Sequence, residues 1–153
     1  MSTYMTKLIV LALWMGFTSS LTWAQPVFLV TEAEAAASFA AGGMLNPRSV
    51  SQPGSPQIEF LTPDISKPVS APTNIDIRFV GNPPSEPKPD SFRVLYGSFR
   101  IDITQRLLGV AKVSKEGIKV KDAVLPKGRH QLSLMITDSM GRQNQQVVAF
   151  TVE

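Results

Sequence analysis

From Gln57 to the C-terminus, apolar and polar residues alternate in short runs. Ile75, Ile77 and Phe79, for example, alternate with Asp76 and Arg78. A period of two places successive side chains on opposite faces of a strand, so each run predicts a strand with one buried and one solvated face. The same period recurs at residues 57–60, 92–96, 99–104, 118–121, 131–137 and 148–152. Because parallel strands buried on both faces read as continuous apolar runs, the alternation favours antiparallel sheets.

Turn-forming residues separate these runs. Gly97 predicts a tight turn or a bulge between two strands, and residues 81–90, which hold four prolines, predict an extended, stiff loop. Residues 104–113 fit either a helical turn or an irregular strand. About seven strands at intervals of roughly 8–15 residues predict an all-β protein, an antiparallel β-sandwich.

Five short motifs in this region occur in a suggestive order. They lie at Pro56–Pro63, Ser70–Ile77, Leu125–His130, Asp138–Arg142 and Phe150–Val152. Through these motifs and their order, residues 57–153 resemble the bacterial immunoglobulin-like or fibronectin-III-like modules of exported proteins. The resemblance implies an immunoglobulin-like sandwich that serves as an interaction or spacer module, and it names no ligand. The paired cysteines and the buried Trp of antibody domains are missing, so no antibody-like function is implied.

The first 24 residues have the order of a secretory signal peptide. A short region carrying Lys7 precedes the apolar run Leu8–Phe17, and a more polar stretch then ends at Ala24. We expect cleavage between Ala24 and Gln25, which exports the protein to the periplasm or the outside. The apolar run is shorter than the roughly 20 residues that span a bilayer, so we expect no transmembrane segment after cleavage. An uncleaved N-terminal anchor is the alternative.

Residues 25–56 predict a short helix followed by a linker. Thr31 and Glu34 fit a capping box, the residues up to Ala41 favour helix, and Gly42-Gly43 would end it. Residues 46–56 are rich in Pro, Gly and Ser, as in a linker. We therefore expect the core domain to begin at residue 57. Segment 27–41 is then either a spacer or a contact for a partner or a membrane surface.

The composition removes most catalytic and metal chemistry. The chain has no cysteine and a single histidine, His130, so it has no disulfide, thiolate zinc site or cysteine nucleophile. In related sandwiches a Tyr often begins the corresponding strand and bonds back to the preceding loop, and we interpret His130 as its substitute. A His130-centred enzyme or metal site is the alternative. We expect no catalytic residue, no metal ligand and no cofactor.

Asp138 belongs to the short loop Asp138–Arg142. A carboxylate there could be a calcium ligand, but calcium needs six to eight oxygens and the motif supplies one certain carboxylate. We expect Asp138 to accept hydrogen bonds from amides of its own loop, with Gly141 at positive φ.

Residues 112–129 form a basic segment in a chain whose net charge is +3. An anionic envelope component is one possible partner for this segment. An edge strand whose lysines block aggregation is the other interpretation. Nucleic acid is not expected, since no stacking aromatics lie among the lysines. The basic residues are Lys112, Lys115, Lys119, Lys121, Lys127 and Arg129.

Together these patterns predict an exported, non-catalytic module that acts by surface contact, as a spacer, an adaptor or a subunit of an envelope assembly. Its partner would be a protein or another envelope component. A binding protein for an anionic envelope component is the first alternative, and an enzyme or metal protein centred on His130 is the second.

Overall fold

The structure, a computed structural model, describes residues 27–41 and 48–153. The predicted signal peptide, its cleavage site between Ala24 and Gln25, and the predicted helix stop at Gly42-Gly43 lie outside the described residues.

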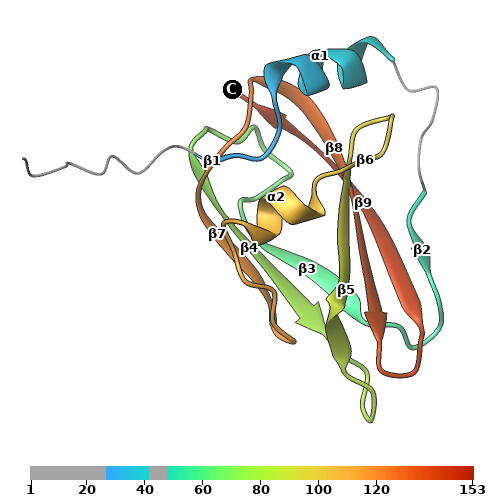
Figure 1. Cartoon of the computed structure of the whole chain (residues 1–153). Helices are drawn as coiled ribbons and strands as arrows, with labels where there is room; N and C mark the ends of the chain where they lie inside the picture. Colours follow the sequence, from blue (N-terminus) through green and yellow to red (C-terminus); the bar gives the residue numbers. More distant parts are fainter. Residues whose placement is uncertain (1–26, 42–47) are drawn as a thin grey trace, which may run out of the picture.

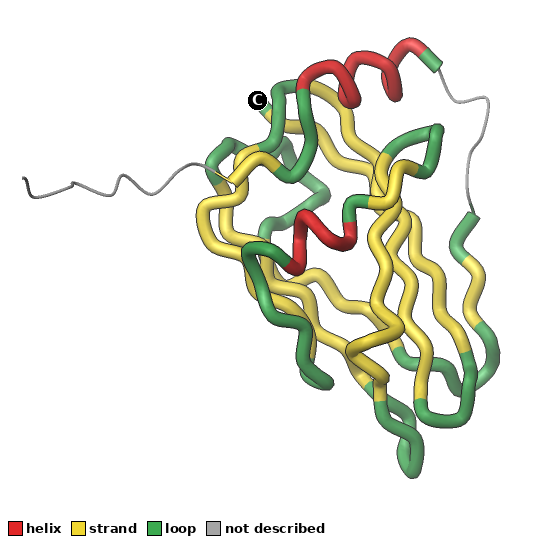
Figure 2. Tube along the Cα trace, viewed as in Figure 1, coloured by secondary structure: helices red, strands yellow, loops and turns green. Residues whose placement is uncertain are grey.

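The described chain folds into two sheets that enclose a common core (Figures 1 and 2). Neighbouring strands pair antiparallel, except that β1 runs parallel to β7. This arrangement is all-β and fits a β-sandwich. The first sheet has the order β1 (Val27–Phe28), β7 (Gly117–Val124), β4 (Thr73–Val80) and β3 (Gln57–Thr62). The second has the order β2 (Val50–Ser51), β9 (Gln143–Val152), β8 (Gly128–Asp138), β5 (Pro87–Tyr96) and β6 (Ile101–Asp102).

The core is built from the apolar members of the alternating runs. Ile77 and Phe79 of β4 and Phe92 of β5 are buried, and the Phe79 and Phe92 rings contact each other at 5.2 Å between centroids. The predicted division into buried and solvated faces is therefore confirmed on these strands. Further core residues are Ile58, Val94, Tyr96, Ile118, Val120, Leu134, Ile136, Val148 and Val152.

Two predicted boundaries around β5 are wrong. The strand already begins at Pro87, inside the predicted loop, and Pro87 pairs with Asp138 of β8. Its prolines are tolerated because β6 covers only Leu95 and Tyr96, which leaves the first part of β5 at a sheet edge. Next, the strand predicted over 99–104 shrinks to β6, because the chain turns sharply at Gly97 and Arg100, both at positive φ.

The ambiguous segment 104–113 begins with helix α2 (Thr104–Leu108). Leu107 of α2 is buried in the core, and the backbone N–H of Val94 donates to Thr104 Oγ1 over 2.9 Å. Helix α2 is therefore bound to β5 through Thr104 and to the core through Leu107.

The N-terminal strap, residues 27–31, belongs to the core, and the prediction that the core begins at residue 57 is wrong there. Leu29 is 4% exposed and Val30 is fully buried. Both residues contact the same interior as Leu107, Val120 and Leu125. The strap pairs with the end of β7 and leads directly into helix α1 (Glu32–Ala40). Its two apolar side chains complete a core that residues 57–153 leave open.

Asp138 plays the predicted loop role. Its Oδ1 accepts from the backbone N–H groups of Met140 (2.9 Å) and Arg142 (2.8 Å), and Gly141 has φ of 80°. Burial opposes ionisation of this carboxyl. The hydrogen bonds from the Arg142 backbone, Ser85, the Arg142 side chain and the Met140 backbone more than offset it and lower the pKa of Asp138 to about 2. The carboxylate oxygens therefore hold their own loop.

Truncation of Val30 should destabilise the whole domain. We expect Val30→Ala to lower the free energy of unfolding by about 2 kcal/mol, because it leaves a cavity in a packed interior. Val50→Ala is the control, since Val50 is 61% exposed and should change stability by less than about 0.5 kcal/mol. Urea denaturation measures both. Equal stability of the two variants would show that the strap is not part of the folded core.

Candidate functional site

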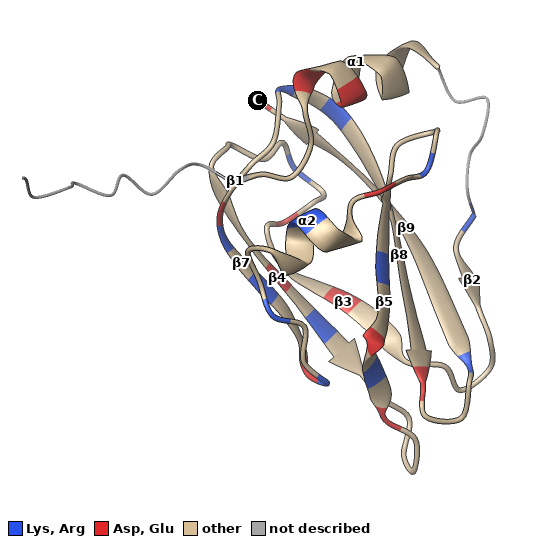
Figure 3. Cartoon of the chain, in the orientation of Figure 1, with Lys and Arg blue, Asp and Glu red and all other residues tan. Residues whose placement is uncertain are grey.

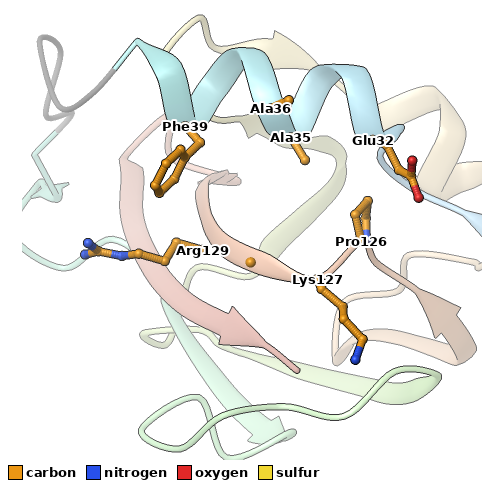
Figure 4. A pocket seen from close by; sticks show the side chains of 8 residues that line it. Glu32, Ala35, Ala36, Phe39, Pro126, Lys127 and Arg129 are labelled. Carbon is orange, nitrogen blue, oxygen red and sulfur yellow. The ribbon is translucent and has the colours of Figure 1, made fainter.

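A groove of about 560 Å³ lies between helix α1 and the turn that joins β7 to β8 (Figure 4). One wall is the helix face that carries Glu32, Ala35, Ala36 and Phe39, and the other wall is residues 126–129. Its size falls within the usual range of ligand pockets. Phe39 points into the space from the helix and is 69% exposed.

The helix that forms one wall is locally well specified but weakly embedded. Thr31 and Glu34 make the predicted capping box, with the Glu34 N–H donating to Thr31 Oγ1 and the Thr31 N–H donating to Glu34 Oε2. None of its nine residues is buried. The residues at positions 32, 35, 36 and 39 have the i, i+3, i+4, i+7 spacing of a single helix face. In α1 this face borders the groove, and of its residues only the half-buried Ala35 also packs against the core.

An ion pair fixes α1 to the sandwich. Arg106 of α2 donates to both carboxylate oxygens of Glu34, at 2.7 and 2.8 Å, and also reaches the Leu29 carbonyl oxygen at 3.4 Å. The hydrogen bond from Arg106 is the main reason that the pKa of Glu34 falls from 4.5 to about 2, with the Thr31 backbone second. One carboxylate thus caps α1 and binds it to α2.

The other end of α1 rests on the β5–β6 turn. The Ser98 N–H donates to Ser38 Oγ over 3.2 Å. Gly97 has φ of 66°, and a Cβ at this position would collide with the Ser38 side chain. Glycine therefore serves both the turn and the close approach of the helix.

His130 holds the opposite wall. Its Nε2–H donates to the Pro126 carbonyl oxygen over 2.7 Å, and Tyr96 O–H donates to Nδ1 over 2.8 Å. A carbonyl oxygen can only accept, which assigns the proton to Nε2. The predicted bond from His130 to the preceding loop is confirmed. Burial lowers the pKa of His130, and the hydrogen bond to Pro126 opposes this shift. The pKa of Tyr96 is raised to about 12, mainly by burial and secondly by the charge of Glu34.

The basic segment is divided between separate places (Figure 3). Lys127 and Arg129 line the groove under α1. Lys112 and Lys119 border a different hollow, together with Asp76 and other charged groups.

Lys115, Lys119 and Lys121 also lie outside the groove. Lys119 Nζ pairs with Asp76 Oδ2 at 2.8 Å, and Lys115 pairs with Glu86. Lys121 is exposed on β7, beside Asp122, where the ladder to β4 shifts register. Strand β7 lies between β4 and β1 in its sheet. Because β1 pairs only with Ala123 and Val124, the rest of the β7 edge that faces away from β4 is not covered by β1. The structure therefore brings only Lys127 and Arg129 of the predicted set to the groove.

The ring nitrogens of His130 are not available to a ligand in the groove. Both ring nitrogens of His130 are engaged, and the side chain is 3% exposed. Among the described residues, no three His, Cys, Asp or Glu side chains come close enough to hold a metal ion. The chemistry that the groove does offer is apolar contact from Phe39, Ala35 and Ala36, together with ionic contact. No helix within 27–41 or 48–153 has the length and hydropathy to cross a membrane.

Sequence reasoning missed the helical wall of the groove. Apolar residues at positions 35, 36 and 39 were present in the sequence, but apolar residues on one helix face usually mark contact with the core. No pattern within α1 distinguishes a face that packs from a face that borders a hollow.

No family model, curated protein or solved structure matches the chain. The geometry and the chemistry of the groove are therefore the basis for assigning a function.

The ion pair between Glu34 and Arg106 should contribute measurable coupling. A double-mutant cycle with Glu34→Gln and Arg106→Gln should give about 0.5–1 kcal/mol at pH 7, measured by urea denaturation. Because the folded pKa of Glu34 is lowered, the coupling is present above pH 4.5 and is lost as the pH falls toward 2. The exposed pair of Arg93 and Asp102, at 3.6 Å, is the control and should couple less. Equal coupling in the two pairs would contradict a special role for Arg106.

His130→Phe should keep the ring packing against Phe150 but lose both hydrogen bonds. We expect a loss of about 1–3 kcal/mol, because the Tyr96 hydroxyl and the Pro126 carbonyl lose their partner.

The same variant should also change the pH dependence. The folded pKa of His130 lies below 6.5, so the unfolded chain binds more protons just below that pH. The wild type should therefore lose stability as the pH falls from 6.5 toward 5, and His130→Phe should lose less over that interval. Parallel pH profiles of the two proteins would contradict the assignment of a neutral, buried imidazole.

Proposed function

We propose that this protein is an exported, non-catalytic immunoglobulin-like module that acts by surface contact, and that the groove beside α1 is its contact surface. Export rests on the pattern of residues 1–24. The role as a contact module is supported by a groove that offers apolar and ionic groups to a partner.

The immunoglobulin-like part of the proposal is supported by strand order. With β3, β4, β5, β7, β8 and β9 taken as strands A, B, C, E, F and G, one sheet contains A-B-E neighbours and the other C-F-G neighbours. His130 at the start of β8 bonds back to the loop before it, which is the role of the corner tyrosine in such domains. These two features arise from different parts of the chain.

The observation that carries the contact role is the exposure of Phe39. A phenylalanine that is 69% exposed beside a groove, on a helix that buries none of its residues, adds apolar surface without stabilising the fold. Aromatic residues are enriched at the centres of protein interfaces, where burial of their rings supplies much of the affinity. A protein or another envelope component that covers Phe39 would bury this surface.

Binding of an anionic envelope component remains the second candidate. Lys127 and Arg129 support it, because both are exposed on the same wall and neither forms a salt bridge with a described residue. Under this candidate Lys127→Glu with Arg129→Glu abolishes binding to anionic envelope polymers and Phe39→Ala leaves it unchanged. Contact through Phe39, in contrast, is lost in Phe39→Ala.

Cross-linking tests the contact role directly. A photoreactive phenylalanine analogue at position 39, in the full chain expressed in its native envelope, should give a discrete cross-linked partner. The same analogue at Met140 is the control. Met140 is also well exposed, at 64%, but it follows the end of β8, whereas the groove is formed by the first residues of that strand. An identical cross-linking pattern at both positions, or none at position 39, would contradict the proposal.

A further inference from the structure

The strand wall of the groove has an open edge. The last pair between β5 and β8 joins Tyr96 to Leu132, and the Gly97 N–H then donates to the Gln131 carbonyl oxygen over 2.8 Å. Strand β8, however, begins at Gly128. Its first residues therefore extend beyond the end of β5, and α1 lies there instead of a strand (Figures 1 and 4).

The direction of the backbone groups on this edge follows from the ladder. In an antiparallel strand, the N–H and C=O of one residue point to the same side, and alternate residues point to opposite sides. Gln131 points its carbonyl toward β5, so the backbone N–H and C=O of Arg129 point to the same side, where β5 has ended. Among the described residues no hydrogen-bond partner is found for these two groups on that side.

The surroundings of this edge are suited to a peptide. Residues of one α1 face, including Phe39 and Ala36, form the opposite apolar wall. Gly128 adds no side chain, and apart from its two chain neighbours no residue has an atom within 4 Å of where its Cβ would be. Lys127 and Arg129 place two cations at the groove against a single carboxylate, that of Glu32.

We propose that the groove binds an extended, acidic peptide segment of a partner protein, which adds as a short strand to the free edge of β8 at Arg129. This inference rests on the proposed contact function and names the chemistry of the partner. One peptide residue exchanges both main-chain hydrogen bonds with Arg129, as in other cases of strand addition. An apolar side chain of the peptide contacts Phe39, and an Asp, a Glu or the C-terminal carboxylate pairs with Lys127 or Arg129.

The polar contacts on both walls prepare this geometry. His130 fixes the Pro126 carbonyl and with it the turn that presents Lys127. The pair of Arg106 and Glu34 fixes the distance of α1 from β8. A groove whose two walls are held before binding loses less conformational entropy when a peptide enters.

Random octapeptides displayed on phage, panned against the purified full chain, provide the probe. We expect the enriched sequences to carry an Asp or Glu, or a free C-terminal carboxylate, close to an apolar residue. A synthetic copy should bind at least about tenfold more weakly to Lys127→Gln, Arg129→Gln and Phe39→Ala. Lys121→Gln and Met140→Ala are the matched controls, since both side chains are exposed outside the groove. Circular dichroism and thermal melting check that each variant is folded.

Methylation of single backbone amides of that peptide tests the strand addition itself. Binding should be lost when the amide opposite Arg129 is methylated and should survive methylation of the next amide, because alternate amides face away from the ladder. A peptide that tolerates every methylation, or a library with no enrichment, overturns the proposal.

Two further outcomes separate this inference from the broader contact role. If position 39 still cross-links to an envelope protein while no peptide binds, strand addition is wrong and the contact role stands. If vesicles with anionic lipids bind and peptides do not, the anionic-component alternative is favoured and the peptide proposal fails. Loss of both cross-linking and peptide binding would remove both proposals.

Discussion

The placement of helix α1 depends on the ion pair between Glu34 and Arg106. The helix buries none of its residues fully, and only the half-buried Ala35 packs against the core, so hydrophobic packing along its length contributes little to its placement. Its position is set by this pair, by the burial of Leu29 and Val30 just before it, and by the contact of Ser38 with the β5–β6 turn. A nine-residue helix is marginal by itself in water. Three contacts near its ends therefore do what a buried apolar face does in an ordinary helix, and they leave the remaining face free for contact with other molecules.

The other wall of the groove depends on a buried histidine in a neutral state. His130 uses one ring nitrogen as a donor and the other as an acceptor, so Tyr96 and the Pro126 carbonyl are both satisfied. Burial of a neutral, fully bonded imidazole costs far less than burial of a charged one. Protonation of His130 would break the hydrogen bond that Nδ1 accepts, so the stability of the β7–β8 turn depends on the protonation state of this ring. The only imidazole of the chain therefore has a structural role.

The charges of the molecule take on different roles once the chain is folded. Lys115 and Lys119 have acidic partners in their ion pairs, Glu86 and Asp76, that are distant in the sequence. Lys127 and Arg129 stay free of salt bridges with described residues and border an apolar hollow. A pair of cations beside an aromatic ring and an open strand edge differs from a uniformly basic surface, because it combines directional hydrogen bonding with apolar contact. This combination favours recognition of a peptide over general attraction to negative charge.

The sequence by itself determined most of the long strands, their two-faced burial and the local caps and turns, because each depends on neighbouring residues. The alternation from Gln57 onward, the capping box of Thr31 and Glu34, and the Asp138 loop all have their cause within a few positions. Only the tertiary structure decided that Leu29 and Val30 complete the core, that Arg106 binds Glu34, and that Phe39 and Arg129 face one groove. Those contacts join residues about 70 to 90 positions apart, and no local pattern can encode the register and the path of the chain that bring them together.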